Sequence, residues 1–387
     1  GDYAFRQCVS LASINIPESV TSIGEYAFRR CVSLASINIP ESVTSIGEWA
    51  FYWCESLTSI TIPDSVTSIG ADAFYNCTGL TSVHITDLNA WCARDFTNYR
   101  ANPIYYAQNL YLNNNLVTDL VIPNNLTAIK NYGFVNCTSL KRVIIPEGVI
   151  SIGSGVFDGC SSLTNITFPA SVTTIDGWAL ADCTGLTSVT IPNTINSIGN
   201  SAFANCTGEL IIKNKNLVET NHGANDNTWL KNSLFEKITI APDNNITSIG
   251  SFAFKDCVST TSISIPQGVT SIGFSAFTGC SSLISTNIPD SVTSIGDRAF
   301  FECSSLVDLT IPDSVVSIGD GVINRCPNLT NLQSKYASED GYCLIVDGVL
   351  VSFSGHNLTE FTIPDGVTAL GELAFYFCSN LESITIP

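Results

Sequence analysis

The chain has 387 residues, of which 45% are hydrophobic, 10% aromatic and only 13% charged, a composition that argues against disorder. It carries 16 Lys and Arg against 34 Asp and Glu, and the net charge of −18 argues against nucleic-acid binding, because such a chain would repel the phosphates it must neutralise. No apolar run approaches the ~18 residues that cross a bilayer, so the sequence predicts no transmembrane segment.

The first 77 residues contain a repeat with a period of 23 residues. Residues 17–24, 40–47 and 63–70 are nearly identical, and the full unit is close to P-x-S-V-T-S-I-G-x-x-A-F-x-x-C-x-S-L-T-S-I-T-I. A period in this range is typical of leucine-rich repeats.

Each repeat reads as two short strands and a turn. Residues 57–62 are rich in β-branched side chains and predict a strand, and residues 66–69 predict a second extended stretch. The spacing of Phe74 and Cys77 predicts one turn of α-helix or 3₁₀-helix, with Phe74 directed inward. Because no repeat can bury its apolar face alone, we expect the repeats to stack into a solenoid of parallel strands.

The residues between the phenylalanine and the cysteine of each repeat vary, and in the first repeats they are aromatic or basic. Tyr3, Tyr26 and Trp49 occupy one phase of the repeat and are expected to stack. Aromatic residues beside arginine are typical of binding hot spots, although partial burial between repeats would explain the same pattern. The candidate binding patch is Tyr26, Arg29, Arg30, Trp49, Tyr52 and Trp53.

Thirteen of the 15 cysteines follow the repeat. Equivalent side chains in a stack point the same way and no C-x-x-C spacing occurs, so we expect a structural ladder of buried, reduced thiols. Cys92 and Cys343 lie outside this ladder and are expected to be its exposed exceptions. The ladder is Cys8, Cys31, Cys54, Cys77, Cys137, Cys160, Cys183, Cys206, Cys257, Cys280, Cys303, Cys326 and Cys378.

Three enlarged repeats interrupt the array at about 87–118, 208–240 and 328–360, and we term them island segments. Each contains two short apolar arms around turn residues and predicts a hairpin: 110–112 with 116–117, 210–212 with 217–218, and 344–346 with 349–351. The islands either cap or bend the stack, or project from it and carry recognition. The candidate island contacts are Trp91, Tyr105, Tyr106, Lys213, Lys215 and Trp229.

Residues 1–387 are interpreted as one continuous repeat array. The chain contains no Met, and both of its ends fall inside a repeat, so we expect it to be a fragment of a longer protein.

The sequence offers little for catalysis. No H-E-x-x-H, G-x-S-x-G or Walker A motif occurs, and His84, His222 and His356 fall at different phases of the repeat. His84 takes an exposed strand position and is expected to be a solvated surface residue. We therefore expect no enzyme activity, no metal site and no cofactor.

The repeating unit resembles the BspA-like, treponemal-type leucine-rich repeat, and the resemblance covers essentially the whole chain. It implies a leucine-rich-repeat solenoid, an α/β horseshoe that is largely β, with one short helical or 3₁₀ turn per repeat. It also implies an extracellular or cell-surface, adhesin-like protein whose partners are host matrix or cell-surface proteins such as fibronectin and fibrinogen. A structural or self-associating repeat protein is the alternative.

Overall fold

The computed structural model describes residues 1–223, 228–242 and 245–387. These residues divide into two units, Gly1–Val189 with Thr194–Thr207 and Thr190–Asn193 with Gly208–Pro387, and each is described by itself. The island segment expected at 208–240 includes four residues, 224–227, that lie outside the described part.

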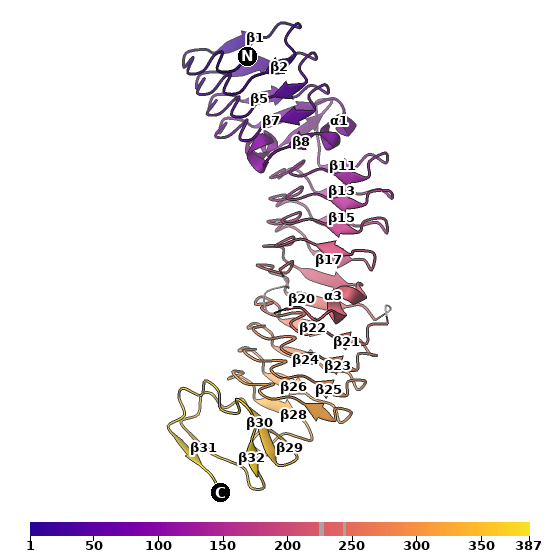
Figure 1. Ribbon diagram of the computed structural model, residues 1–387, viewed down its shortest axis with the longest axis vertical. Helices are drawn as coiled ribbons and strands as arrows, with labels where there is room; N and C mark the ends of the chain where they lie inside the picture. The colour runs from indigo at the N-terminus through magenta and orange to yellow at the C-terminus, as the bar shows by residue number, and fades with distance from the viewer. Residues whose placement is uncertain (224–227, 243–244) are drawn as a thin grey trace. The chain divides into compact units, whose positions relative to one another are not determined.

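In the first unit, each repeat adds a strand of two to four residues to a parallel layer (Figure 1). The register equals one repeat, so Ser13 pairs with Ser36 and Ile14 with Ile37. Strand β17 (Ser188–Ile191) runs from the first unit into the second. The other strands of this series are β1 (Ser13–Asn15), β3 (Ser36–Asn38), β5 (Ser59–Thr61), β7 (Ser82–Ile85), β9 (Leu110–Leu112), β11 (Asp119–Val121), β13 (Arg142–Ile144) and β15 (Asn165–Thr167).

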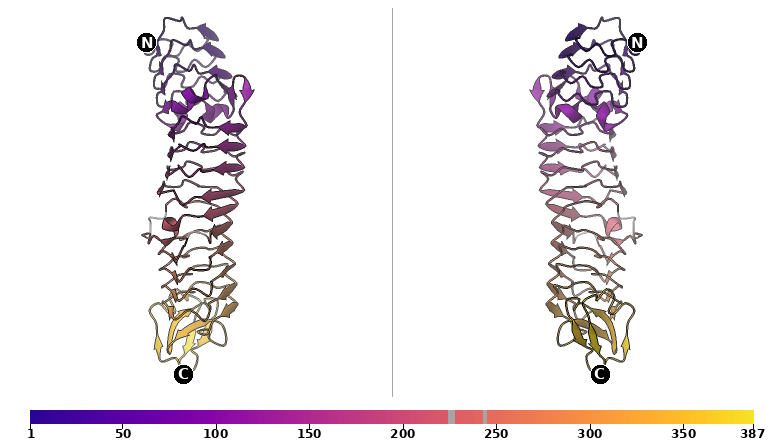
Figure 2. Two further views of the ribbon diagram at one scale, coloured as in Figure 1. Left: turned by 90° about the vertical axis from the view of Figure 1, so that its right-hand side faces the viewer. Right: turned by 90° about the vertical axis from the view of Figure 1, so that its left-hand side faces the viewer.

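A second parallel series of two-residue strands follows the conserved Ser-Ile of each repeat, with the serine facing outward and the isoleucine inward. Figure 2 shows the two series as layers within each unit. The members in the first unit are β2 (Ser22–Ile23), β4 (Ser45–Ile46), β6 (Ser68–Ile69), β8 (Asp95–Phe96), β12 (Ala128–Ile129), β14 (Ser151–Ile152), β16 (Thr174–Ile175) and β18 (Ser197–Ile198).

The turn segment of each regular repeat, which leads from the glycine to the cysteine, is a chain of β-turns. Within it, the N–H of Arg29 donates to Tyr26 O and that of Cys31 to Phe28 O, whereas the intervening N–H of Arg30 donates along the stack to Tyr52 O at 2.7 Å. Because alternate N–H groups serve the neighbouring repeat, a continuous helix cannot form. The predicted fold class is confirmed, and the helical turn expected in each repeat takes this form instead.

Two positions of each turn segment have a positive φ, as the third residue of a type II turn requires. They lie five residues and one residue before the cysteine, for example Tyr26 (φ 55°) and Arg30 (φ 61°) before Cys31. Bulky residues seldom adopt this conformation, so the hydrogen bonds along the stack impose it.

The core consists of columns of identical side chains. Phe51 and Phe74 are fully buried and stack 5.1 Å apart, and Ile60 and Leu57 are buried beside them. The Sγ of Cys77 donates to Phe51 O of the preceding repeat at 3.1 Å, so each thiol satisfies a turn carbonyl as well as filling space.

The first island replaces a regular turn segment with helices α1 (Leu88–Ala93), η1 (Tyr99–Ala101) and α2 (Ile104–Ala107). Strand β9 then pairs antiparallel with β10 (Asn115–Leu116) through Asn113 and Asn114, which both have a positive φ. Arg94 is buried in this island, where its Nε donates to Val66 O and its Nη2 to Pro63 O.

The second unit repeats the same plan. Its first series contains β19 (Glu209–Ile212), β20 (Lys237–Ile240), β22 (Ser262–Ser264), β24 (Ser285–Asn287), β26 (Asp308–Thr310) and β28 (Asn331–Gln333). Its second series contains β21 (Ser248–Ile249), β23 (Ser271–Ile272), β25 (Ser294–Ile295) and β27 (Ser317–Ile318).

The hairpin predicted for 210–218 is wrong. Its second arm forms helix α3 (Lys215–Glu219), because the Asn214 side chain accepts the N–H of Leu217 as an N-cap and Val218 is buried.

In the third island, β29 (Cys343–Val346) pairs antiparallel with β30 (Val349–Phe353) through Asp347 and Gly348, both with a positive φ. The unit ends with β31 (Glu360–Thr362), β32 (Ala369–Leu370) and β33 (Ser383–Thr385).

Candidate functional site

Aromatic side chains of the first turn segments stack along the first unit. The rings of Tyr3 and Tyr26 lie 4.9 Å apart, and those of Tyr26 and Trp49 lie 5.9 Å apart. The stacking predicted from their shared phase is therefore confirmed. The stacking follows from the backbone, because in each repeat the residue with the positive φ lies directly next to its equivalent in the preceding repeat.

Arginine side chains cover these rings. The guanidinium of Arg29 lies over the rings of Tyr26 and Tyr52, at 5.4 and 5.1 Å from their centroids. Arg30 lies 4.9 Å from the Trp53 centroid. These cation–π contacts restrain side chains that would otherwise be mobile. The six residues of the candidate patch are thus brought together on one surface.

The surface extends beyond the predicted patch into the first island. The Tyr52 ring stacks on Tyr75 at 5.1 Å, and Arg100 lies over both Tyr75 and Tyr99. The candidate patch did not include these residues, although Tyr75 occupies the variable position one period after Tyr52; Arg100 has no equivalent in phase. We call the whole surface the aromatic–arginine strip, and it comprises Tyr3, Arg6, Tyr26, Arg29, Arg30, Trp49, Tyr52, Trp53, Tyr75, Tyr99 and Arg100.

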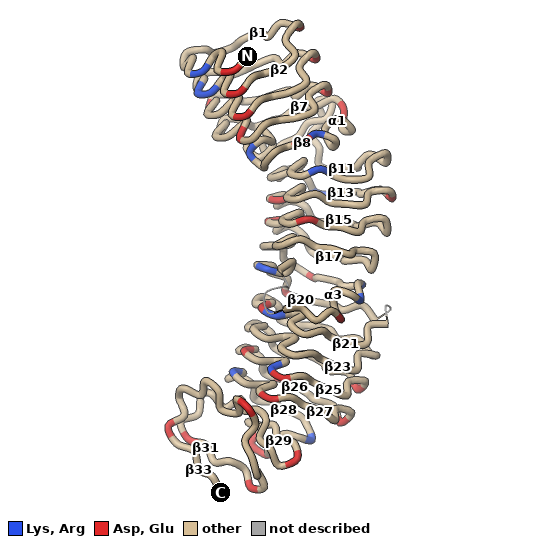
Figure 3. The backbone as a smooth tube through the Cα atoms, viewed as in Figure 1, with Lys and Arg blue, Asp and Glu red and all other residues tan. Residues whose placement is uncertain are grey.

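Charge is arranged in columns beside the strip. Figure 3 shows two neighbouring basic segments at the turns near β1 and β2, next to a row of acidic segments. The acidic row includes Asp2, Glu25 and Glu48, each of which directly precedes an aromatic residue of the strip. The strip therefore presents positive charges on turn segments that begin with a carboxylate.

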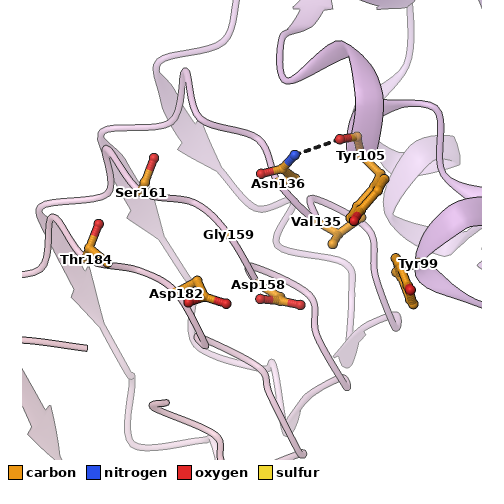
Figure 4. A pocket seen from close by; sticks show the side chains of 9 residues that line it. All are labelled: Tyr99, Tyr105, Val135, Asn136, Asp158, Gly159, Ser161, Asp182 and Thr184. Atoms are coloured by element: carbon orange, nitrogen blue, oxygen red, sulfur yellow. Dashed lines mark hydrogen bonds between the residues drawn. The ribbon is translucent and has the colours of Figure 1, made fainter. Parts of the chain in front are cut away.

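A hollow of about 530 Å³ opens beside the end of the strip in the first unit (Figure 4). Tyr99 and Tyr105 form one wall, and the Nδ2 of Asn136 donates to Tyr105 O at 2.6 Å. Gly159 (φ 75°) forms part of the floor, where a side chain would collide with Asn136. The remaining lining residues are Val135, Asp158, Ser161, Asp182 and Thr184.

Asp158 is an acidic residue of this hollow whose pKa is raised. Burial, and secondarily the charge of Asp182, raise the pKa of Asp158 from 3.8 to about 7. The Asp182 carboxylate instead accepts a hydrogen bond from Asn205 Nδ2 at 2.7 Å. Asp158 thus titrates near neutrality, which makes the polarity of the hollow dependent on pH.

A hollow of about 560 Å³ occurs at the same phase of the repeat in the second unit. Gly279 (φ 76°) takes the place of Gly159, since both directly precede a ladder cysteine. Its polar lining is different and includes Glu302, Arg325 and His356. The repeat backbone therefore forms a hollow at this position, whereas the side chains of each unit determine its charge and polarity.

Two of the candidate island contacts are not available for recognition. Trp91 is fully buried, and its Nε1 donates to Gly133 O at 2.9 Å, while Trp229 is only 4% exposed. Both tryptophans pack in the core, so their role as surface anchors is wrong. Tyr105 and Tyr106 are half-buried.

The two lysines among the island contacts reach the surface of the second unit. Lys213 is exposed, whereas Lys215 pairs with Glu219 at 3.4 Å and donates to Asn245 O.

The cysteine ladder is almost entirely buried, and its thiols are free. The expected exceptions are wrong: Cys92 and Cys343 are buried, and burial raises the pKa of each thiol to about 12. Cys8 is exposed and Cys378 half-buried. Cys92 and Cys343 lie outside the 23-residue ladder, but helix α1 and strand β29 direct them into the core together with their other apolar side chains.

His84 also differs from expectation, because its half-buried ring stacks on Tyr111 at 4.8 Å. In residues 1–223, 228–242 and 245–387, no group of three or more His, Cys, Asp or Glu side chains is placed to hold a metal ion. Among the same residues, no helix has the length and apolar character to span a membrane.

The sequence matches the family described as BspA type leucine rich repeat region (6 copies) over residues 1–111, 104–228, 225–338 and 351–387. The chain belongs to this family. The resemblance predicted from the repeating unit is thereby confirmed. No curated protein matches the chain in sequence.

Two solved structures are similar to this BspA-type chain. A leucine-rich repeat protein from Bacteroides ovatus is 24% identical with a TM-score of 0.52, over 97% of this chain and 92% of that one. A leucine rich cell surface protein from Faecalibacterium prausnitzii is 26% identical with a TM-score of 0.40, over 97% of this chain and 87% of that one. The first similarity shows a shared fold.

Proposed function

We propose that this leucine-rich repeat protein is a non-enzymatic, surface-displayed interaction module that binds host matrix or cell-surface proteins in the manner of an adhesin. Membership of the BspA-type family supports a role in binding other proteins, since the family resemblance implies a cell-surface protein with protein partners. The observation that carries the proposal is the aromatic–arginine strip. Tyr, Trp and Arg dominate binding energy at protein interfaces, and here their side chains are already ordered against one another.

The regular strand surface is a poorer candidate for recognition. Its outward positions are mostly small, as in the Ser13–Ser36 and Asn15–Asn38 pairs, and such residues anchor few interfaces. The strip combines large apolar area with charge in one place. Recognition by the strip also needs no enzyme-like constellation of nucleophile and base.

The proposal is tested by binding of the purified chain to immobilised fibronectin, fibrinogen and other matrix proteins. The double variant Trp49→Ala, Trp53→Ala is expected to lower affinity for a bound partner at least tenfold. The matched control is Trp178→Ala, because Trp178 occupies the same phase as Trp49 but lies outside the strip and is 51% exposed. Equal affinity of both variants would contradict a role for the strip. Concentration-dependent light scattering without partner binding would favour self-association instead.

A further inference from the structure

The four arginines of the strip are not ion-paired among the described residues, although the negative charge of Asp72 acts on Arg100. Arg6, Arg29, Arg30 and Arg100 form no ion pair and donate no side-chain hydrogen bond within the part of the chain that the structure describes. Asp2 lies on the same turn segment as Arg6, and Glu25 on that of Arg29 and Arg30, yet neither forms an ion pair with them. Ion pairs are seen elsewhere in the described residues, for example between Arg142 and Asp119 and between Arg325 and Glu302.

Two of these guanidinium groups are linked by a continuous series of ring contacts. Arg29 contacts Tyr52 at 5.1 Å, Tyr52 stacks on Tyr75 at 5.1 Å, and Arg100 contacts Tyr75 at 4.7 Å. A group already restrained in this way loses little further freedom when it binds. Guanidinium groups also match carboxylates with two parallel hydrogen bonds.

Two further donors of the strip also lack a hydrogen-bond acceptor. The Nε of Arg29 and the Nε1 of Trp53 are buried and have no acceptor among the described residues. A buried donor without an acceptor is unfavourable. Because these two atoms are shielded from solvent, the donors that a ligand can reach are the other N–H groups of the unpaired guanidinium groups, and these favour a ligand that brings acceptors.

We propose that the aromatic–arginine strip binds an extended acidic segment of a protein partner, with one carboxylate at Arg29 and another at Arg100. This inference rests on the proposed function and specifies the chemistry of the partner. Laid end to end, the contacts from Arg29 through Tyr52 and Tyr75 to Arg100 span at most ~15 Å, and an extended chain advances ~3.3 Å per residue, so we place the two acidic residues about four positions apart. The intervening side chains pack on Tyr52 and Tyr75.

The neighbouring carboxylates favour a protein segment over a sulfated polysaccharide. Asp2, Glu25 and Glu48 border the strip and would repel a polymer that is charged on every unit. A peptide places its carboxylates singly and leaves uncharged residues opposite the acidic row. Trp49 and Trp53 further supply the apolar area that protein segments use.

The experiment measures fluorescence anisotropy of a labelled 12-residue peptide of Gly, Ser and Tyr with two Glu residues four positions apart. The matched probe has Gln in place of both Glu residues, and a heparin-derived oligosaccharide forms a third arm. The Glu peptide is expected to bind the intact chain at least tenfold more tightly than the Gln peptide, and the preference is expected to shrink at high salt.

Variants locate the site. Arg29→Gln with Arg100→Gln is expected to remove the preference for Glu, whereas Arg142→Gln retains it, because Arg142 is an exposed arginine of β13 that pairs with Asp119. Circular dichroism establishes that each variant is folded, and the comparison of the two peptides on the unchanged chain does not depend on any variant.

Three results would overturn the inference: equal binding of the two peptides, equal loss with Arg142→Gln, or tight binding of the oligosaccharide without preference for Glu. Loss of matrix-protein binding in the Trp49→Ala, Trp53→Ala variant, together with equal binding of the peptides, would leave the proposed function in place and reject only the acidic partner.

Discussion

At the scale of single residues, the turn segments place bulky side chains in a conformation that favours glycine and asparagine. Trp178 has a φ of 54° and is half-exposed, so little packing compensates for its backbone. For residues other than Gly, Asn and Asp, the left-handed conformation costs about 1–2 kcal/mol in conformational free energy. The strain is tolerated because the Trp178 N–H donates to Asn200 O of the next repeat at 3.1 Å.

Replacing Trp178 tests this backbone requirement. We expect Trp178→Val to be less stable than Trp178→Asn by about 1–2 kcal/mol, because a β-branched side chain fits the left-handed region worst. Urea unfolding measures the difference. Equal stability of the two variants would show that the position is not held left-handed.

Asp158 provides a pH-dependent test. Its pKa is raised to about 7 in the fold and is near 3.8 when the chain is unfolded. The folded state then binds the proton more tightly, so this group lowers the free energy of unfolding as pH rises from about 4 to about 7. Asp158→Asn is expected to raise the thermal midpoint at pH 8 and to leave it unchanged near pH 3. Asp182→Asn serves as a neighbouring control with a smaller effect, since Asp182 is exposed.

At the scale of the element, the cysteine column is a structural device. Each thiol fills the core and donates to a carbonyl of the preceding repeat, as Cys54 does to Phe28 O at 3.2 Å. Burial raises the pKa of these thiols, so the reactive thiolate is scarce at neutral pH.

Alkylation measures this protection. In the native chain, a mild reagent is expected to modify Cys8 fully and Cys378 partly, while the other thiols react only after denaturation without reductant. Mass spectrometry after denaturation is expected to find all 15 cysteines labelled. Rapid native labelling of Cys92 or Cys343 would contradict their burial.

The strands and the core could be predicted because equivalent positions in successive regular repeats have the same structural surroundings. Ile60 and Phe74 are buried for the same reason as their equivalents, so a residue's phase identifies its face. The islands lack that redundancy: Trp91 donates to Gly133, 42 residues away, and nothing in the local sequence separates a buried tryptophan from an exposed anchor. The turn was expected to be helical because spacing within one repeat does not show that alternate N–H groups bond between repeats.

At the scale of the whole molecule, stability depends on coupling between neighbouring repeats. Phe74 is fully buried and stacks on Phe51, so Phe74→Ala is expected to cost roughly 3–5 kcal/mol. The increase in amide hydrogen exchange is expected to be greatest in the mutated repeat and to decline along the first unit. Val121→Ala is the control, since Val121 is exposed on a strand of the same unit. A uniform increase across that unit would contradict nearest-neighbour coupling.

The 23-residue register has a consequence for how such a chain can change. Because Ser22 pairs with Ser45 and Ser45 with Ser68, a regular repeat between two others meets the same partner surface on both sides. Gain or loss of a whole regular repeat therefore preserves all backbone pairings and alters only the number of display positions. The variable residues before each cysteine, such as Arg29 and Tyr52, can then diverge without disturbing the hydrogen bonds that hold them. The fold thus separates the backbone pairings that hold the stack from the side chains that it displays.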